Sequence, residues 1–503
     1  MRKGLSPFHL HSHRVSDTST PKTMADHKLD TMKEPEAYTH EIDPVRERAL
    51  VRKLDLIIIP PVMLCYILSF LDRVNIGNAV LYGLETDLHL SSEQYQTAVS
   101  ILFVTYILSE LPSNLILKHY VRPSRWISFI TTAWGIIATL TGVTQNYAGL
   151  IVCRLLLGLV EGGLFPGLAI YLTFFYTKRE LGLRVGYLFV SAAIAGACGG
   201  LLAYGIGHMD GVAGQRGWRW IMILEGLPTF VLGIACWFWL ADDPETAYFL
   251  TQEEKELMLR RRAAQGGQVD HFDWADARKG LKDWKIYAFS FGQFGGDTML
   301  YGFSTFLPTI IKGLNPSWSS ALVQVLTIPV YATGAVVYIS VAILSDRTGR
   351  RGPFACALGL VSIVGYAMLM SKSSSGVHYA GCFLVACGLY VLVGIPLAWL
   401  PNNNPRYGKR TTATGLQLTI GNTSGIMAGF LYPAKEGPRF LRGHGVTLAL
   451  VAWSVCVYGF MSWYFTQENR KRQNGERDEK ISGMSEEEIT ALGDENPRYR
   501  FTT

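Results

Sequence analysis

Four ionisable side chains in the first part of the sequence interrupt segments that are otherwise apolar. Asp72 and Arg73 follow the apolar run 54–70, and Arg154 and Glu161 lie in CRLLLGLVEGGLFPG. A charge on a membrane-spanning helix costs roughly 2.5–3.5 kcal/mol on insertion scales, so such residues are rare unless they are paired or used. The planar guanidinium of arginine binds a carboxylate through two hydrogen bonds, and a carboxyl group in a low-dielectric site can exchange a proton. These residue types indicate anion binding and proton transfer.

The spacing of these four residues predicts which of them point in the same direction from their helices. Adjacent residues on a helix point about 100° apart, so Asp72 and Arg73 need not neutralise each other. Arg154 and Glu161 are about two helical turns apart and share a face of their helix. Arg73 and Arg154 are expected at similar depths in the outer half of the membrane. We predict that Arg73 and Arg154 bind the anion, and that Asp72 and Glu161 carry protons. The alternative is that all four form permanent ion pairs that fix helix packing.

Two further polar residues of the first part are expected to have supporting roles. Asn75 lies one helical turn after Asp72 and is predicted to hold that carboxylate. Glu110 precedes Pro112 by two residues in YILSELPSN, toward the inner end of its segment. We predict structural pairing or gating at the inner face for Glu110.

The second part of the sequence carries a polar stripe. Gln293, Asp297 and Tyr301 recur at every fourth position, which places them on one face of a helix. Gln293 and Tyr301 are predicted to bind substrate, whereas Asp297 either lines the same cavity or caps a break in a glycine-rich helix. The amides of Gln417 and Asn422 serve either as contacts between helices or as ligand donors.

The segments that carry these residues have the composition of membrane-spanning helices. The chain has 503 residues, of which 49% are hydrophobic and 17% charged, and its mean hydropathy is +0.19. Soluble domains of this length seldom reach these values. Windows of about 20 residues, enough to cross about 30 Å of hydrocarbon, recur along the chain. We expect spans near 54–80, 95–117, 126–145, 149–175, 184–207, 218–240, 286–311, 320–344, 353–371, 378–400, 412–433 and 445–466.

Twelve such windows predict an all-α membrane protein with two halves of six transmembrane helices, because helices satisfy their backbone groups internally. The polar connector between the halves contains Thr251 and Glu254, a capping box that predicts an amphipathic helix. The expected organisation is a disordered N-terminal tail over 1–53, a six-helix half over 54–240, a connector over 241–285, a second six-helix half over 286–466 and a C-terminal tail over 467–503. Translation can start at Met1 or Met24.

Lysine and arginine gather in alternate loops, whereas the loops YGLETDLHLSS and TQNYA contain neither. Because such residues mark cytoplasmic loops, both termini and the connector are expected in the cytoplasm. The first fifty residues lack the apolar core and cleavage site of a signal peptide. We predict a multi-pass protein of the plasma membrane that works as a monomer in the lipid bilayer.

Several function classes are disfavoured by composition and motif content. The net charge is +6 without a clustered basic face, so no nucleic-acid partner is expected. The eight cysteines occur singly, mainly within apolar segments, and predict neither a disulfide framework nor a metal site. No GxSxG or HExxH motif is present, which disfavours an enzyme. We expect no cofactor.

The loop SDRTGRRGP between two spans resembles the cytoplasmic loop signature of the major facilitator superfamily. Asp346, Arg347 and Arg350, with Arg351, are expected to lock helix ends together rather than to contact substrate. Parallel halves with nested inverted repeats bind substrate at the membrane midplane by alternating access, which disfavours a channel. Ala342 stands where the signature usually has glycine.

Five segments together resemble the fungal anion:cation symporter family, which includes allantoate, nicotinate and pantothenate permeases. They are FLDRVNIGNA, ELPSNLILK, RLLLGLVEGGLFPG, DDPETAYFLTQEEKELM and GDENPRYRF, in the order of that family. The resemblance implies that Asp72 and Glu161 carry protons, that Arg73 and Arg154 meet the substrate anion, and that Asn422 lies near substrate.

The resulting hypothesis is a transporter that couples uptake of a small organic anion to protons. The chain departs from the family near Phe175, where tryptophan is common, so no single permease is assigned. Two alternatives stay open: a proton-driven exporter of a metabolite or drug, and a nutrient sensor that does not transport. An exporter typically keeps an intact loop signature in its first half, and here that signature has lost its aspartate.

Overall fold

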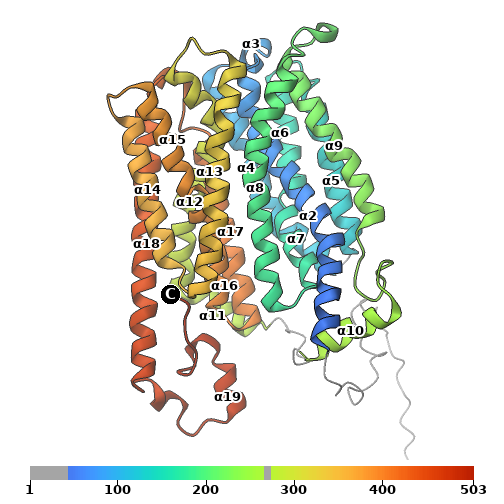
Figure 1. The fold of residues 1–503 in the computed structure, drawn as a ribbon, viewed down its shortest axis with the longest axis vertical. Helices are drawn as coiled ribbons and strands as arrows, with labels where there is room; N and C mark the ends of the chain where they lie inside the picture. Colours follow the sequence, from blue (N-terminus) through green and yellow to red (C-terminus); the bar gives the residue numbers. More distant parts are fainter. Residues whose placement is uncertain (1–42, 120, 265–272) are drawn as a thin grey trace, which may run out of the picture. The chain divides into compact units, whose positions relative to one another are not determined.

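The computed structural model describes residues 43–119, 121–264 and 273–503, and these residues form helices joined by turns and loops (Figure 1). The first six spans are called here the N-terminal half. Their helices are α2 (Pro44–Val80), α4 (Ser92–His119), α5 (Pro123–Thr141), α6 (Tyr147–Glu161) with α7 (Leu164–Thr173), α8 (Lys178–Gly207) and α9 (Gly217–Trp239), and the short α3 (Leu84–Asp87) precedes α4.

The other six spans are called the C-terminal half. Their helices are α12 (Trp284–Leu314), α13 (Ser320–Thr348), α14 (Gly352–Met370), α15 (Ser375–Leu389) with α16 (Val391–Asn402), α17 (Tyr407–Ala428) and α18 (Leu441–Gln473). The connector contributes α10 (Gln252–Ala264) and α11 (Trp274–Lys282), and α19 (Glu486–Ala491) follows α18. The predicted capping box forms before α10, because Glu254 accepts from the Thr251 N–H and donates its own N–H to the Thr251 hydroxyl.

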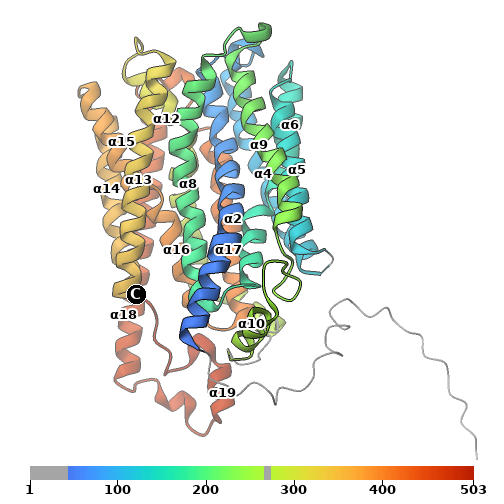
Figure 2. The same cartoon turned by 45° about the vertical axis from the view of Figure 1, so that its right-hand side comes forward.

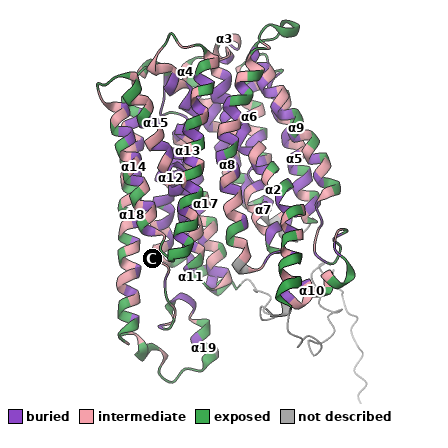
Figure 3. Ribbon diagram, in the orientation of Figure 1, coloured by how far each residue is buried: buried purple, intermediate pink, exposed green. Residues whose placement is uncertain are grey.

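The outer surface of the helix bundle is apolar, as a lipid-facing surface must be. Eight of the described helical segments are long and apolar enough to cross a membrane. The other four, α4, α5, α12 and α17, carry more polar residues, and many of these are buried against neighbouring helices, as Thr131 and Gln417 are. Large apolar side chains point outward instead, with Leu108 68% and Phe238 77% exposed. Figure 3 shows exposed residues along the outside and buried residues between the helices.

Two helices extend beyond the predicted apolar windows. Helix α2 begins at Pro44, where Asp43 caps the chain by accepting from the Val45 N–H at 2.9 Å. The prediction of a disordered tail over 1–53 is therefore wrong for residues 44–53, and its remaining part lies almost wholly outside the described residues. Helix α18 continues to Gln473, beyond the apolar window that predicted it, and its last turn is basic.

Two predicted spans are broken near their middle. Helix α6 ends at Glu161 and α7 starts at Leu164, with Gly162 and Gly163 between them. A Cβ atom on Gly162 would overlap the main chain of Tyr106, so this break allows α4 to approach closely. The tenth span is likewise divided into α15 and α16 at Tyr390. Glu161 thus lies at the end of a helix inside the bundle.

The halves pack together along three pairs of helices: α2 with α12, α4 with α17 and α8 with α13. Figures 1 and 2 show α2 starting at the end that also carries α10 and α19, which we call the base; the opposite end is the top. Hydrogen bonds join the halves at the top, where Ser320 donates to the Leu81 carbonyl at 3.0 Å and Gln324 donates to Asn78 at 3.2 Å. The structure is therefore closed at the top.

Residues 493–503 fold back onto the base of the C-terminal half. Asp494 accepts hydrogen bonds from Lys285 of α12 and Lys409 of α17, each at 2.8 Å. Phe501 stacks on Phe465 of α18 with ring centroids 4.7 Å apart. Burial by itself would raise the pKa of Asp494, but the two lysines lower it below its usual value. This segment, called here the C-terminal strap, ties three helices together.

Candidate functional site

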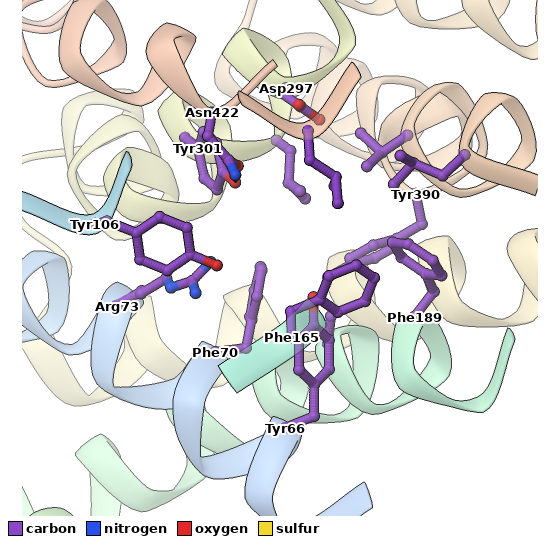
Figure 4. A pocket seen from close by; sticks show the side chains of 15 residues that line it. Tyr66, Phe70, Arg73, Tyr106, Phe165, Phe189, Asp297, Tyr301, Tyr390 and Asn422 are labelled. Atoms are coloured by element: carbon purple, nitrogen blue, oxygen red, sulfur yellow. The ribbon is translucent and has the colours of Figure 1, made fainter. Parts of the chain in front are cut away.

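A cavity of about 540 Å³ lies between the two halves near mid-height. Its walls come from α2, α4, α7 and α8 on one side and from α12, α16 and α17 on the other. Figure 4 shows one wall of aromatic side chains, formed by Tyr66, Phe70, Phe165 and Phe189. The site therefore combines an apolar, aromatic surface with a few polar groups, which is the usual composition of a small-molecule site.

Arg73 of α2 is the cationic group of this cavity. Its Nε donates to Glu161 Oε1 at 2.7 Å, and the Ser69 hydroxyl donates to the same oxygen at 2.5 Å. The Arg73 guanidinium carbon also lies 4.8 Å from the ring centroid of Tyr106, which Figure 4 shows beside it. Glu161 ends α6 at the glycine break, so the break positions the carboxylate that orients Arg73. Ser69 and Tyr106 are site residues that sequence analysis did not identify.

The opposite wall holds a polar chain that crosses between the halves. The Tyr301 hydroxyl donates to Asn422 Oδ1 at 2.7 Å, and Asn422 Nδ2 donates to Glu110 Oε2 at 3.4 Å. Figure 4 places Tyr301 and Asn422 together, near Arg73. Tyr301 and Asn422 line the cavity as the sequence indicated. Glu110 of α4 lies behind them and pairs with the other half.

Asp297 lines the cavity, whereas its neighbour Gln293 does not. Gln293 Nε2 donates to Asp297 Oδ1 at 2.8 Å, and Gln417 Nε2 donates to Gln293 Oε1 at 3.2 Å. Gln293 is completely buried between α12 and α17. It lines neither this cavity nor the second one described below. Its prediction as a substrate ligand therefore gains no support from the structure, because its amide is used to hold Asp297.

A second cavity of about 380 Å³ contains both predicted anion ligands, Arg73 and Arg154. It shares Phe70, Arg73 and Tyr301 with the first cavity, so the two spaces adjoin. Arg154 of α6 is 4% exposed, and its Nε has no hydrogen-bond partner. A buried N–H without an acceptor is costly, and a bound anion would supply the missing acceptor. The structure thus places the two arginines around one cavity.

Asp72 lies outside the lining of both cavities, within the N-terminal half. Asn75 Nδ2 donates to Asp72 Oδ1 at 3.5 Å, a weak form of the predicted contact. The same amide donates a shorter hydrogen bond to Glu225 of α9. Glu225 is 3% exposed and was missed in the sequence, although a carboxyl group in the apolar run WIMILEGLP carries the signal that identified Glu110.

The loop between α13 and α14, which carries the predicted signature residues, contains an ion pair and a hydrogen bond. Asp346 accepts from Arg351 at 3.0 Å, and the hydroxyl of Ser345 donates to the Arg350 carbonyl at 2.9 Å. The side chains of Arg347 and Arg350 are exposed. Of the residues predicted to lock the helix ends, Asp346 and Arg351 form an ion pair between α13 and α14, and Arg350 contributes its main-chain carbonyl.

Comparisons with known proteins place the chain in a family. A family model described as Major Facilitator Superfamily matches residues 62–429. The chain belongs to the major facilitator superfamily. An uncharacterized transporter of Schizosaccharomyces pombe is 40% identical over 92% of each chain. A high-affinity nicotinic acid transporter of Saccharomyces cerevisiae is 33% identical, covering 85% of this chain and 79% of its own. The predicted family is confirmed.

A solved major facilitator structure agrees with the fold. The structure of a bacterial homolog of the human lysosomal transporter Spinster superposes with a TM-score of 0.65, covering 84% of this chain and 98% of that chain at 15% identity. The twelve-helix major facilitator fold predicted from the apolar windows is confirmed. This major facilitator protein is a multi-pass membrane transporter rather than an enzyme, as its named relatives are transporters.

Proposed function

We propose that this major facilitator protein couples the uptake of a small organic anion to protons by alternating access. The observation that carries the proposal is Arg154, a buried guanidinium whose Nε lacks a partner and which lines the same cavity as Arg73. Glu161 already pairs with Arg73, so the Arg154 Nε–H is a donor at this cavity that lacks an acceptor. A carboxylate would accept hydrogen bonds from both arginines.

The shape of the larger cavity favours a flat, partly aromatic carboxylate. Tyr66, Phe70, Phe165 and Phe189 offer ring faces and edges for stacking, and Asn422 and Tyr301 offer polar contacts on the other wall. The nicotinic acid transporter relative is named for an anion of this kind. Nicotinate and similar aromatic monocarboxylates are therefore the first substrates to test.

Glu161 provides a route for coupling in this proposal. In the present structure Glu161 neutralises Arg73 through a 2.7 Å ion pair. A substrate carboxylate that binds Arg73 competes with Glu161 for the same guanidinium, and in this proposal the displaced Glu161 carries the proton. Anion and proton would thus bind together and be released together.

The direction of transport in the proposal follows from the loops at the base. The arginine-bearing loops between α13 and α14 and between α16 and α17 lie at the end that carries α10 and α19, whereas the loop between α17 and α18, with Lys435 and Arg439, lies at the top. We place the base in the cytoplasm and the protein in the plasma membrane. The structure closed at the top would then be the state from which substrate leaves inward.

The test is uptake by the purified transporter in liposomes. Labelled nicotinate, benzoate and allantoate are offered with and without an imposed proton gradient. We expect concentrative uptake of at least one carboxylate only when the gradient is present, and loss of uptake in Arg154→Gln. Arg442→Gln is the matched control, because the side chain of Arg442 is 75% exposed. Failure of all three anions to accumulate, or accumulation that ignores the gradient, would contradict the proposal.

A further inference from the structure

Two buried carboxyl groups of the N-terminal half share one amide. Asn75 Nδ2 donates to Asp72 on its own helix, α2, and to Glu225 on α9. All three residues are almost fully buried, with 6% of Asp72, 3% of Glu225 and none of Asn75 exposed. One oxygen of each side chain has no hydrogen-bond partner: Asp72 Oδ2, Asn75 Oδ1 and Glu225 Oε1.

The charges around this cluster do not balance if both carboxyl groups are ionised. Arg73 is already paired with Glu161. Arg154 of α6 is the cation that acts on Asp72, while Glu161 acts on Asp72 with the opposite sign. The groups that act on Glu225 are Asp72 and Asn75, and neither of them is a cation. One guanidinium therefore acts on Asp72 and none in the described residues is found to act on Glu225, and two like charges in a buried site cannot both be ionised at low cost.

We propose that Asp72, Asn75 and Glu225 form a proton-binding site that holds one proton shared between the two carboxyl groups. The proposal rests on the proposed function and adds Glu225 to it as a proton-binding residue. The step is a simple association: a proton from water forms an O–H bond with one carboxylate oxygen, and the same bond breaks on release. The unpartnered oxygen atoms are the acceptors that this proton would occupy.

Arg154 connects this site to the anion, because it lines the second cavity and also acts on Asp72. Without an anion, the guanidinium charge stabilises ionised Asp72 and favours proton release. With a carboxylate bound, that charge is neutralised, and the Asp72–Glu225 pair retains its proton more strongly. Proton and anion thus stabilise each other's binding, and this coupling is reciprocal by linkage.

The indole of Trp134 gives this site a wall on α5. Trp134 is fully buried, and its indole lies beside the Asp72 carboxyl group. Trp134, Asp72 and Glu225 are all absent from the lining of the two cavities. The proton site therefore does not line either cavity, so that a proton can be held there without touching the anion.

Infrared difference spectroscopy of the purified transporter tests the site without any substrate. A protonated carboxylic acid has a carbonyl-stretch band that glutamine and asparagine lack. We expect a pH titration of the wild-type protein to show such a band, and both Glu225→Gln and Asp72→Asn to change its intensity or titration. Glu225→Asp should restore a titrating band. An unchanged band in Glu225→Gln would overturn the proposal.

Transport measurements test the coupling. Nicotinate binding to the wild-type protein should tighten by about 5- to 150-fold as the pH falls from about 8 to about 5, and Glu225→Gln should lose most of this dependence. Glu225→Gln should still exchange labelled for unlabelled nicotinate across the membrane. Glu85→Gln, the same change on α3 outside the cluster, should behave as wild type.

The outcomes separate this proposal from the proposed function. If no carboxylate binds to the wild-type protein, the proposed function fails, while the infrared band still decides whether the proton site exists. A sodium gradient that replaces the proton gradient for wild-type uptake would overturn the proposal, since the three free oxygens would then bind a cation. If Glu225→Gln does not fold, Asn75→Ala serves instead, and it should split the shared titration into two separate ones.

Discussion

The two arginines of the site have the same chemistry but different surroundings. Arg73 is paired with Glu161, whereas Arg154 is buried with its Nε unpartnered. Both are expected to bind the anion, yet their removal has different consequences for the fold. Removing Arg73 leaves Glu161 buried and unpaired, whereas removing Arg154 also removes a buried Nε–H that has no acceptor, so its cost should be smaller.

We therefore predict that Arg73→Gln lowers thermal stability, by about 3–5 kcal/mol in free energy of unfolding, because Glu161 is left buried without its cation. Arg154→Gln should lower the melting temperature less than Arg73→Gln does. Both variants should weaken nicotinate binding by at least about tenfold, the equivalent of one lost charge-assisted hydrogen bond. Melting curves in detergent and equilibrium binding measure the two effects.

The double variant Arg73→Gln with Glu161→Gln is the control for this prediction. It removes both charges of the pair, so most of the lost stability should return while binding stays weak. Equal losses of stability in Arg73→Gln and Arg154→Gln would show that the ion pair between Arg73 and Glu161 does not contribute to the free energy of unfolding.

At the scale of helices, the closed top depends on close contact between α2 and α12. Gly77 of α2 faces the main chain of Thr305 of α12, and a Cβ atom there would overlap the Thr305 carbonyl. We predict that Gly77→Ala separates the halves at the top and shifts the population away from the present state. Hydrogen exchange of the top-end segments 74–90 and 315–327 should then rise.

Gly205→Ala is the matched control, because Gly205 lies near the top end of α8 and a Cβ atom there meets nothing within 4 Å. This variant should exchange as the wild type does. If Gly77→Ala also leaves the exchange unchanged, the α2–α12 contact does not hold the top closed.

The helices were predictable from the sequence because their signal is local. A window of about 20 apolar residues can only be stable in hydrocarbon as a helix, so each window identified its span. The break at Gly162 depends instead on the approach of α4, and the role of Gln293 depends on Gln417, a partner 124 positions away. Interactions between distant segments leave no periodic pattern in the sequence.

The sequence identified most of the charged residues of the candidate site, but it did not predict which residues they pair with. The cost of a charge in the membrane singled out Arg73, Arg154 and Glu161. The same rule would have found Glu225, had it been applied to the sixth span. The pairing of Arg73 with Glu161 rather than Asp72, and the exclusion of Asp72 from both cavities, follow from helix rotation in the folded bundle.

At the scale of the whole molecule, the C-terminal strap makes the base of the C-terminal half one rigid piece. Asp494 joins α12 to α17 through Lys285 and Lys409. The main chain of Thr502 accepts from the indole of Trp399 on α16 at 2.7 Å, and Phe501 stacks on α18. In the proposed alternating access this half would move as one body, and the strap links four of its helices at the base.

We predict that Asp494→Asn lowers the melting temperature at neutral pH, because Lys285 and Lys409 lose a buried counter-charge. The pKa of Asp494 is lowered in the folded protein, so its ionised form stabilises the fold fully above the unfolded pKa of about 3.9. This stabilisation is lost as the pH falls through the lower folded value. The difference in melting temperature between wild type and variant should therefore stay constant from about pH 8 to about pH 5 and shrink below about pH 4. Glu486→Gln, a change at an exposed carboxylate of α19, should show a much smaller difference. If the difference in melting temperature between wild type and Asp494→Asn already shrinks between about pH 7 and about pH 5, the pKa of Asp494 is not lowered in the folded protein.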